Sequence, residues 1–180
     1  MVNGNNPDFS RAPIELLWRH AGMQSDFSNP RPVLVIVDDD PDQLSLLQIA
    51  AERVGLFSEV ITAGDGAVAL KEIESLAKIS GPHFSSVIIL TDLKMPRVGG
   101  IELARRLCRH RRIESIALVA MSNTLYEPEV HEALAAGCCA FVQKPSGFQE
   151  LKRMLLSLPE LCGAREQLGY DVTEEAESVA

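Results

Sequence analysis

The sequence predicts an α/β fold: a doubly wound parallel sheet of five strands with helices on both faces. From residue 32 to residue 158, short apolar runs alternate with longer segments of helical periodicity, which is the pattern of consecutive β-α units. The run Val87 to Leu90 is continuously apolar, as in a strand buried on both faces of a parallel sheet. Polar residues stand at the ends of the strand runs, and functional residues gather at the carboxyl edge of such sheets.

Local signals give the boundaries of the elements. Asp40 can cap a helix that accepts Pro41 in its first turn, and Gly55 ends that helix. A turn at 64–66 leads into the next helix, and Pro159 is expected to stop the last one. The predicted strands cover residues 33–37, 57–62, 87–92, 116–121 and 140–143, and the predicted helices cover 41–54, 67–77, 100–111, 127–136 and 148–158.

Two flanking segments enclose the domain of residues 32–158. Residues 1–31 form a polar N-terminal extension in which 12–23 can form a short helix. Ile14, Leu17 and Trp18 would share one face of that helix, either packed on the domain or available to a partner. Residues 159–180 form an acidic tail, with room for a short helix at 160–168.

The composition is that of a soluble globular protein, with 46% hydrophobic and 23% charged residues. A formal net charge of −8 argues against a general affinity for nucleic acid, which needs clustered Lys and Arg. The first residues lack the pattern of a signal peptide, and no run approaches the ~20 apolar residues that span a bilayer. The four cysteines form no CxxC pair, which favours free thiols in a reducing compartment. We therefore expect a cytoplasmic protein without a membrane partner.

Polar side chains follow four of the five predicted strands. They are Asp38 and Asp39, Asp92, Ser122 and Lys144. These four strands would be neighbours in the sheet, so their ends converge on one edge. Three carboxylates there would repel one another, and Mg²⁺ or Mn²⁺ would remove the conflict because hard cations prefer oxygen ligands. A hydroxyl and an ammonium opposite them suit phosphate oxygens. The set predicts a carboxylate nucleophile that attacks phosphorus.

Five sequence blocks in matching order resemble the receiver domain of two-component response regulators, over residues 32 to about 158. They are VLVIVDDDP at 33–41, AGDGAVAL at 63–70, TDLKMPRVGG at 91–100, AMSN at 120–123 and GCCAFVQKP at 137–145. The resemblance implies a flavodoxin-like sheet with strand order 2-1-3-4-5. The segment KPSGFQEL, with no output domain attached, further resembles the stand-alone regulators paired with bacteriophytochrome-type kinases.

The resemblance also implies a role for each acidic residue. Asp92 would accept the phosphoryl group. Asp38, Asp39, Asp92 and the backbone carbonyl of Lys94 would hold the metal ion. Lys94 and Thr124 stand two residues after the acceptor and switch positions, where the family tunes dephosphorylation.

The remaining site residues match the switch of the family. Ser122 would be the switch hydroxyl, and Lys144 would contact the phosphoryl oxygens. Phe141 falls at the switch aromatic, where the family often has Tyr, so a step that needs a tyrosine hydroxyl is excluded. The Lys144–Pro145 bond would be cis, as is usual in the family.

The expected function is therefore a single-domain response regulator rather than an enzyme. A sensor histidine kinase or a phosphotransfer protein would supply the phosphoryl group in a magnesium-dependent step. The signal would leave through the face built from the helix at 127–136, the strand at 140–143 and the last helix, in a monomer or a homodimer without a DNA-binding domain. Two alternatives stay open: an interaction module that works without phosphorylation, and, more remotely, a haloacid-dehalogenase-like phosphatase.

Overall fold

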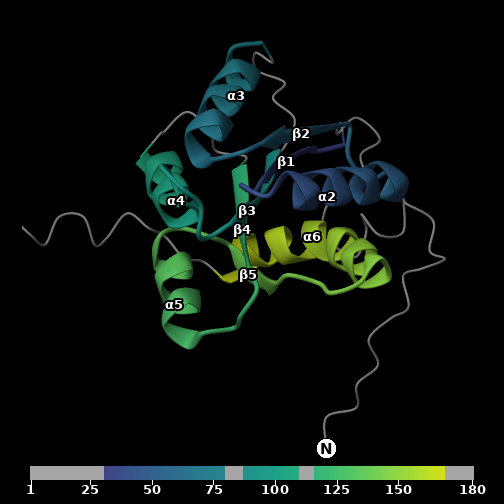
Figure 1. The fold of residues 1–180 in the computed structure, drawn as a ribbon. Helices are drawn as coiled ribbons and strands as arrows, with labels where there is room; N and C mark the ends of the chain where they lie inside the picture. Colours follow the sequence, from purple (N-terminus) through teal and green to yellow (C-terminus); the bar gives the residue numbers. More distant parts are fainter. Residues whose placement is uncertain (1–30, 80–86, 110–115, 169–180) are drawn as a thin grey trace, which may run out of the picture.

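The computed structural model describes residues 31–79, 87–109 and 116–168 and contains a five-stranded parallel sheet in the order β2-β1-β3-β4-β5 (Figure 1). This confirms the predicted fold class and strand order. The strands are β1 (Val33–Val37), β2 (Glu59–Ala63), β3 (Val87–Asp92), β4 (Ile116–Ser122) and β5 (Ala140–Gln143). The helices are α2 (Pro41–Val54), α3 (Gly66–Ile79), α4 (Gly100–Arg109), α5 (Glu127–Ala135) and α6 (Phe148–Leu168).

The sheet forms the middle of three layers. Helices α2 and α6 lie on one side of it, and α3, α4 and α5 lie on the other (Figure 1). Side chains along β1 alternate between the two faces, as the pleat of a strand requires. Leu34 and Ile36 pack under α2 and α6, whereas Val35 and Val37 pack under the other three helices. All five residues of β1 are buried, which explains its continuously apolar sequence.

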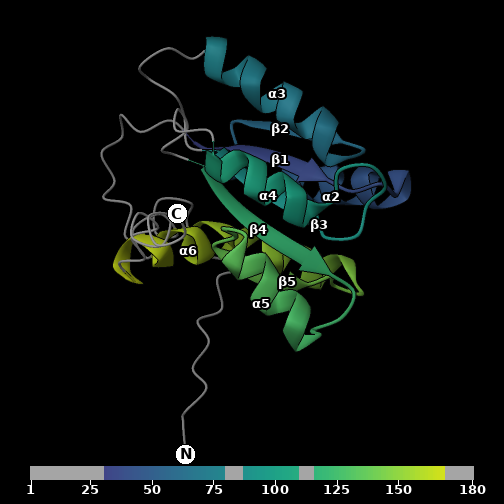
Figure 2. The same cartoon turned by 90° about the vertical axis from the view of Figure 1, so that its left-hand side faces the viewer.

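The strand register aligns the carboxyl ends of four strands. Val37 of β1 pairs with Thr91 of β3, and Asp92 pairs with Met121 of β4. Ser122 then pairs with Gln143 of β5. The strand arrows point the same way, so the residues that follow them emerge at one edge of the sheet (Figure 2).

The last helix corrects one prediction. Pro159 does not stop α6, which continues to Leu168 and absorbs the short helix expected at 160–168. A proline inside a helix removes one hydrogen bond at a cost of ~3 kcal/mol. Burial offsets that cost here, because Leu158 is fully buried and Leu161 and Cys162 pack against the core beyond it.

Two smaller predictions also differ from the structure. Strand β2 begins at Glu59 rather than residue 57, and the Ser58 amide just before it donates to the Pro32 carbonyl at 2.9 Å. The Lys144–Pro145 bond is trans, the lower-energy isomer of an X–Pro bond. The helix expected at 12–23 lies outside the described residues, as do positions 110–111 and 169–180.

None of the four cysteines takes part in a disulfide. In the part of the chain that the structure describes, no helix combines the length and apolar character needed to cross a membrane.

Candidate functional site

Asp38 follows β1 and lies beneath the carboxyl edge of the sheet. Its side chain is only 1% exposed. The Asp38 amide donates to the Ala63 carbonyl of β2 at 3.1 Å, and Oδ1 accepts from the Asp40 amide at 3.0 Å. Asp40 in turn caps α2 by accepting from the amides of Asp42 and Gln43, as its position before Pro41 predicted. Asp38 is thus held between a strand end and a helix N-terminus.

Asp92 occupies the last position of β3. The residue is 7% exposed, and its Oδ2 accepts from the backbone amide of Lys94 at 2.8 Å. The Thr91 hydroxyl donates to the Asp92 carbonyl at 2.9 Å. A Cβ atom on Gly100 would collide with that same carbonyl oxygen. The start of α4 therefore requires glycine for the backbone to close around Asp92.

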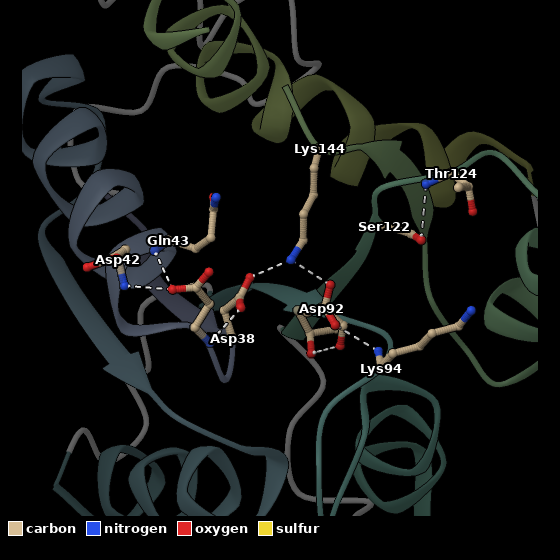
Figure 3. A network of polar contacts seen from close by, with 10 residues as sticks. Asp38, Asp42, Gln43, Asp92, Lys94, Ser122, Thr124 and Lys144 are labelled. Carbon is tan, nitrogen blue, oxygen red and sulfur yellow. Dashed lines mark hydrogen bonds and ion pairs between the residues drawn. The ribbon is translucent and has the colours of Figure 1, made fainter. Parts of the chain in front are cut away.

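Lys144 joins the two carboxylates. Its Nζ lies 2.7 Å from Asp38 Oδ2 and 2.7 Å from Asp92 Oδ1 (Figure 3). The Lys144 amide donates to the Ser122 carbonyl at 2.7 Å, which fixes the base of the side chain beside β4. Burial alone would lower the pKa of the Lys144 ammonium, but its hydrogen bonds to Asp38 and Asp92 outweigh burial and raise that pKa. Lys144 offsets the repulsion that the sequence predicted between these carboxylates.

The two predicted switch residues, Ser122 and Phe141, differ in their position relative to this cluster. Ser122 is 7% exposed, and its Oγ accepts from the Thr124 amide at 3.4 Å (Figure 3). Phe141 of β5 is half-buried against the core beneath α3, α4 and α5. The structure therefore brings Ser122 to the same edge as Asp92 and Lys144, while Phe141 faces the core.

The predicted metal ligands are only partly assembled. Asp38 and Asp92 converge on a single nitrogen atom, whereas Asp39 is exposed at the rim. No three His, Cys, Asp or Glu side chains are close enough to hold a metal ion in the described ranges. The donors that do converge are carboxylate oxygens, the ligand type that Mg²⁺ prefers. The chemistry of the site therefore fits a hard divalent cation. Of the three predicted carboxylate ligands, Asp39 is the one that does not lie with the others.

An ion pair between the buried Asp65 and the exposed Arg97 holds the loop after Asp92, and the sequence analysis did not single it out. Asp65 is 2% exposed and caps α3 by accepting from the amides of Ala67 at 2.7 Å and Val68 at 2.9 Å. Arg97 donates to its other oxygen through Nε at 2.8 Å and through Nη2. The Val68 amide and the Arg97 guanidinium hold the pKa of Asp65 below its ordinary value of 3.8. The turn signal at 64–66 was visible in the sequence, but its partner 32 residues later was not.

The side chain of Lys94 makes a second link from the same loop. Its Nζ lies 2.6 Å from Glu129 Oε1 in the first turn of α5. The hydrogen bond to Glu129 raises the pKa of the Lys94 ammonium, and the nearby Asp92 carboxylate adds to this effect. No sequence signal pointed to Glu129, because a lone glutamate at a helix start usually needs no partner.

The sequence profile of the response regulator receiver domain matches residues 34–156. Two curated relatives show how far the likeness extends. One is a probable methanogenesis regulatory protein, FilR2, of Methanothrix harundinacea, which is 25% identical over 71% of this chain and 81% of its own length. The other is the chemotaxis protein CheY1 of Helicobacter pylori, also 25% identical, over 68% of this chain and 92% of its own length.

Solved structures share the fold. The chemotaxis response regulator CheY4 of Vibrio cholerae matches with a TM-score of 0.58 at 20% identity, over 71% of this chain and 98% of its own. The phosphorylated cyanobacterial phytochrome response regulator RcpA matches with a TM-score of 0.61 at 19% identity, over 73% of this chain and 94% of its own. At these identities the likeness describes the architecture alone.

Proposed function

Because the chain belongs to the response regulator receiver domain family, we propose that Asp92 accepts a phosphoryl group from a sensor histidine kinase or a phosphotransfer protein. Receiver domains are phosphoacceptor signalling modules, and the domain would work as one without an attached effector. The observation that carries the proposal is the Lys144 ammonium between Asp38 and Asp92, 2.7 Å from each. A buried cation beside a candidate nucleophile is what a transferring phosphoryl group needs.

In the proposed reaction, Asp92 Oδ1 attacks phosphorus. The oxygen–phosphorus bond forms as the phosphorus–nitrogen bond of a phosphohistidine breaks, and the imidazole leaves with the electron pair. Lys144 already contacts Oδ1, so its ammonium can donate hydrogen bonds to the phosphoryl oxygens and neutralise their negative charge. The Lys94 amide holds Oδ2 and orients the carboxylate for attack. Positioning and charge neutralisation supply most of the catalysis of phosphoryl transfer.

Magnesium or manganese would be held by Asp38, Asp39, Asp92 and the carbonyl of Lys94. The bound cation would neutralise charge on the transferring phosphoryl group. Binding of the metal would require the exposed Asp39 side chain to turn inward. It would also weaken the ion pair between Lys144 and Asp38. Metal binding and the resting ion pairs therefore compete for the same oxygens.

The output would be a population shift between two conformations. Phosphorylation adds about −1.5 to −2 charge at Asp92. Ser122 would move toward the new oxygens, and Phe141 would turn into the space that opens. The face formed by α5, β5 and α6 would then change and be read by protein contact. A shift from 1:99 to 99:1 requires about 5.5 kcal/mol of differential interaction, which Lys144, Ser122 and the cation can supply together. We place this relay in the cytoplasm, in a monomer or a homodimer.

The test is chemical identification of the adduct. The protein is incubated with Mg²⁺ and phosphoramidate, a small donor with a phosphorus–nitrogen bond, and then treated with hydroxylamine. An acyl phosphate at Asp92 would become a hydroxamate on the peptide that contains residue 92. No hydroxamate, together with no change in the NMR spectrum of the protein on addition of beryllofluoride, would favour an interaction module that works without phosphorylation.

A further inference from the structure

The ion pair between Lys94 and Glu129 connects the loop after Asp92 to α5. Lys94 makes two contacts at once: its amide donates to Asp92 Oδ2 at 2.8 Å, and its ammonium lies 2.6 Å from Glu129 Oε1. The first contact belongs to the site and the second to the helix that starts after β4. A change at Asp92 can therefore reach α5 through one residue.

The two ends of this pair are unequal. The Lys94 side chain is 74% exposed and Figure 3 shows it extended away from the cluster, whereas the Glu129 side chain is 19% exposed. Among the described residues, Glu129 Oε2 is buried and has no hydrogen-bond partner. Glu129 thus depends on Lys94, while Lys94 can reach other partners on a flexible four-carbon chain. Removing the cation would take the ion pair from the other oxygen, Oε1, as well and leave the carboxylate charge uncompensated in a covered position, which is costly.

A phosphoryl group would compete for Lys94. It would lie on the side chain two residues before Lys94 and would carry about −1.5 to −2 charge, more than the single charge of Glu129. A mobile ammonium moves toward the larger charge when both lie within its reach. Glu129 would then be left without its cation, and the first turn of α5 could relieve this only by moving the carboxylate into solvent.

We propose that the Lys94–Glu129 pair is the latch that holds α5 in its resting position, and that phosphorylation opens it by drawing Lys94 away. This inference rests on the proposed function of Asp92. The segment that would move is marked by two exposed side chains, Leu125 at 61% and Tyr126 at 60%. The Tyr126 carbonyl accepts from the Glu129 amide at 2.9 Å, so displacement of Glu129 moves Tyr126 with it. Opening the latch would therefore change the position of the exposed Leu125 and Tyr126 side chains at the start of α5.

Tyr126 provides a direct readout. The chain contains two tyrosines, so fluorotyrosine labelling gives two fluorine NMR signals, assigned with a Tyr170→Phe variant. In the wild type, beryllofluoride with Mg²⁺ should shift the Tyr126 signal. In Lys94→Met, the Tyr126 signal should lie near the position seen for the wild type with beryllofluoride, even when no beryllofluoride is added. The reason is that Glu129 lacks its cation in this variant from the start. In Glu129→Gln, the Tyr126 signal should stay at the position of the untreated wild type, and beryllofluoride should shift it much less. This variant has no carboxylate charge that could lose its cation.

Glu132→Gln is the matched control. It removes another ion pair between elements, Arg105 Nη2 to Glu132 Oε1 at 3.1 Å, one turn further along α5 and without a contact to the loop of Asp92. This variant should respond as the wild type does. Intact mass after treatment with acetyl phosphate is recorded for every variant. A phosphoryl adduct with the same Tyr126 response in wild type, Lys94→Met and Glu129→Gln would overturn the latch alone. The absence of an adduct in the wild type would overturn the proposed function and, with it, the opening by phosphorylation.

Discussion

At the scale of single residues, Lys144 determines the state of the site. Its ammonium contacts one oxygen of Asp38 and one of Asp92, and its side chain is only 12% exposed. Two nearly buried carboxylates without this cation would repel each other. The same ammonium occupies the oxygens that a divalent cation would bind. Lys144 would thus stabilise the metal-free domain and, in the proposed function, oppose metal binding.

Replacing Lys144 by Met tests this double role. The variant should lose about 3 kcal/mol of unfolding free energy, because removing one partner of a buried ion pair leaves the other uncompensated. Mg²⁺ should recover more stability in this variant than in the wild type. Urea unfolding with and without MgCl₂ measures both effects, with the exposed Lys71→Met as control. Equal stabilisation of the two proteins by Mg²⁺ would mean that Lys144 and the metal do not share ligands.

At the scale of elements, helix starts fix the loops of the site. Asp40 caps α2 beside Asp38, and Asp65 caps α3 while holding Arg97 of the loop after β3. Arg97 has a φ of 65°, a left-handed conformation that costs a non-glycine residue about 1 kcal/mol or more. The ion pair with Asp65 helps to hold it there. The caps therefore position functional loops as well as ending helices.

The Asp65 carboxylate should give a distinct pH dependence. Its pKa in the folded protein lies below 3.8, so its contribution to stability is complete above pH 3.8 and is lost as the pH falls through the folded value. Asp65→Asn retains a capping side chain but not the charge. The difference in unfolding free energy between wild type and Asp65→Asn should therefore be largest at neutral pH and shrink in acid. Urea unfolding over this pH range measures it, and a difference that grows toward low pH would contradict the account. Glu74→Gln, an exposed change on the same helix, is the control.

Gly100 should tolerate no side chain. A Cβ there would collide with the Asp92 carbonyl, a backbone atom that cannot move without shifting the acceptor. Gly100→Ala should cost about 1–3 kcal/mol, in the range of overpacking a closed site, and should slow phosphorylation of Asp92. Gly147→Ala is the matched control, because nothing lies within 4 Å of its Cβ position. Thermal unfolding and phosphorylation by acetyl phosphate compare the two variants. Similar losses in both would show that the Asp92 backbone is not constrained at Gly100.

Sequence periodicity predicted most elements because β1 and β3 are buried along their whole length and α2 has clear capping and terminating residues. The convergence of Asp38, Asp92 and Lys144 was also predictable, since each lies at the carboxyl end of a parallel strand. Pro159 misled the analysis because a local signal was overridden by tertiary burial of Leu158. Arg97 and Glu129 could not be found, because long-range ion pairs between loops and helices leave no periodic pattern.

At the scale of the whole molecule, the elements of the proposed switch, α5, β5 and α6, come from both faces of the sheet. Helices α2 and α6 share one core, and α3, α4 and α5 share the other (Figure 1). Lys144 follows β5 and precedes α6, while Ser122 precedes α5. In the proposed switch, events at the site would act first on α5, β5 and α6. The start of α3 is joined to the loop after Asp92 by the Asp65–Arg97 pair and by the hydrogen bond from the Gly66 amide to the Val98 carbonyl.

Beryllofluoride with Mg²⁺ should show which elements the switch moves. Backbone amide NMR shifts should concentrate in α5, β5 and the start of α6, because Ser122, Phe141 and Lys144 lead there. The exposed side of α2, which includes Leu46 and Ile49, should change little and serves as the internal control. Shifts of equal size in α2 and in α5, β5 and the start of α6 would indicate a general change in stability rather than a directed switch.

The most direct test of the central claim is the intact mass of the protein after incubation with acetyl phosphate and Mg²⁺, for the wild type and for Asp92→Asn. The account predicts one added phosphoryl group on the wild type, none on the variant, and none on the wild type when the metal is chelated. A phosphoryl group on Asp92→Asn, or one that forms without a divalent cation, would contradict the assignment of Asp92 and of the metal site.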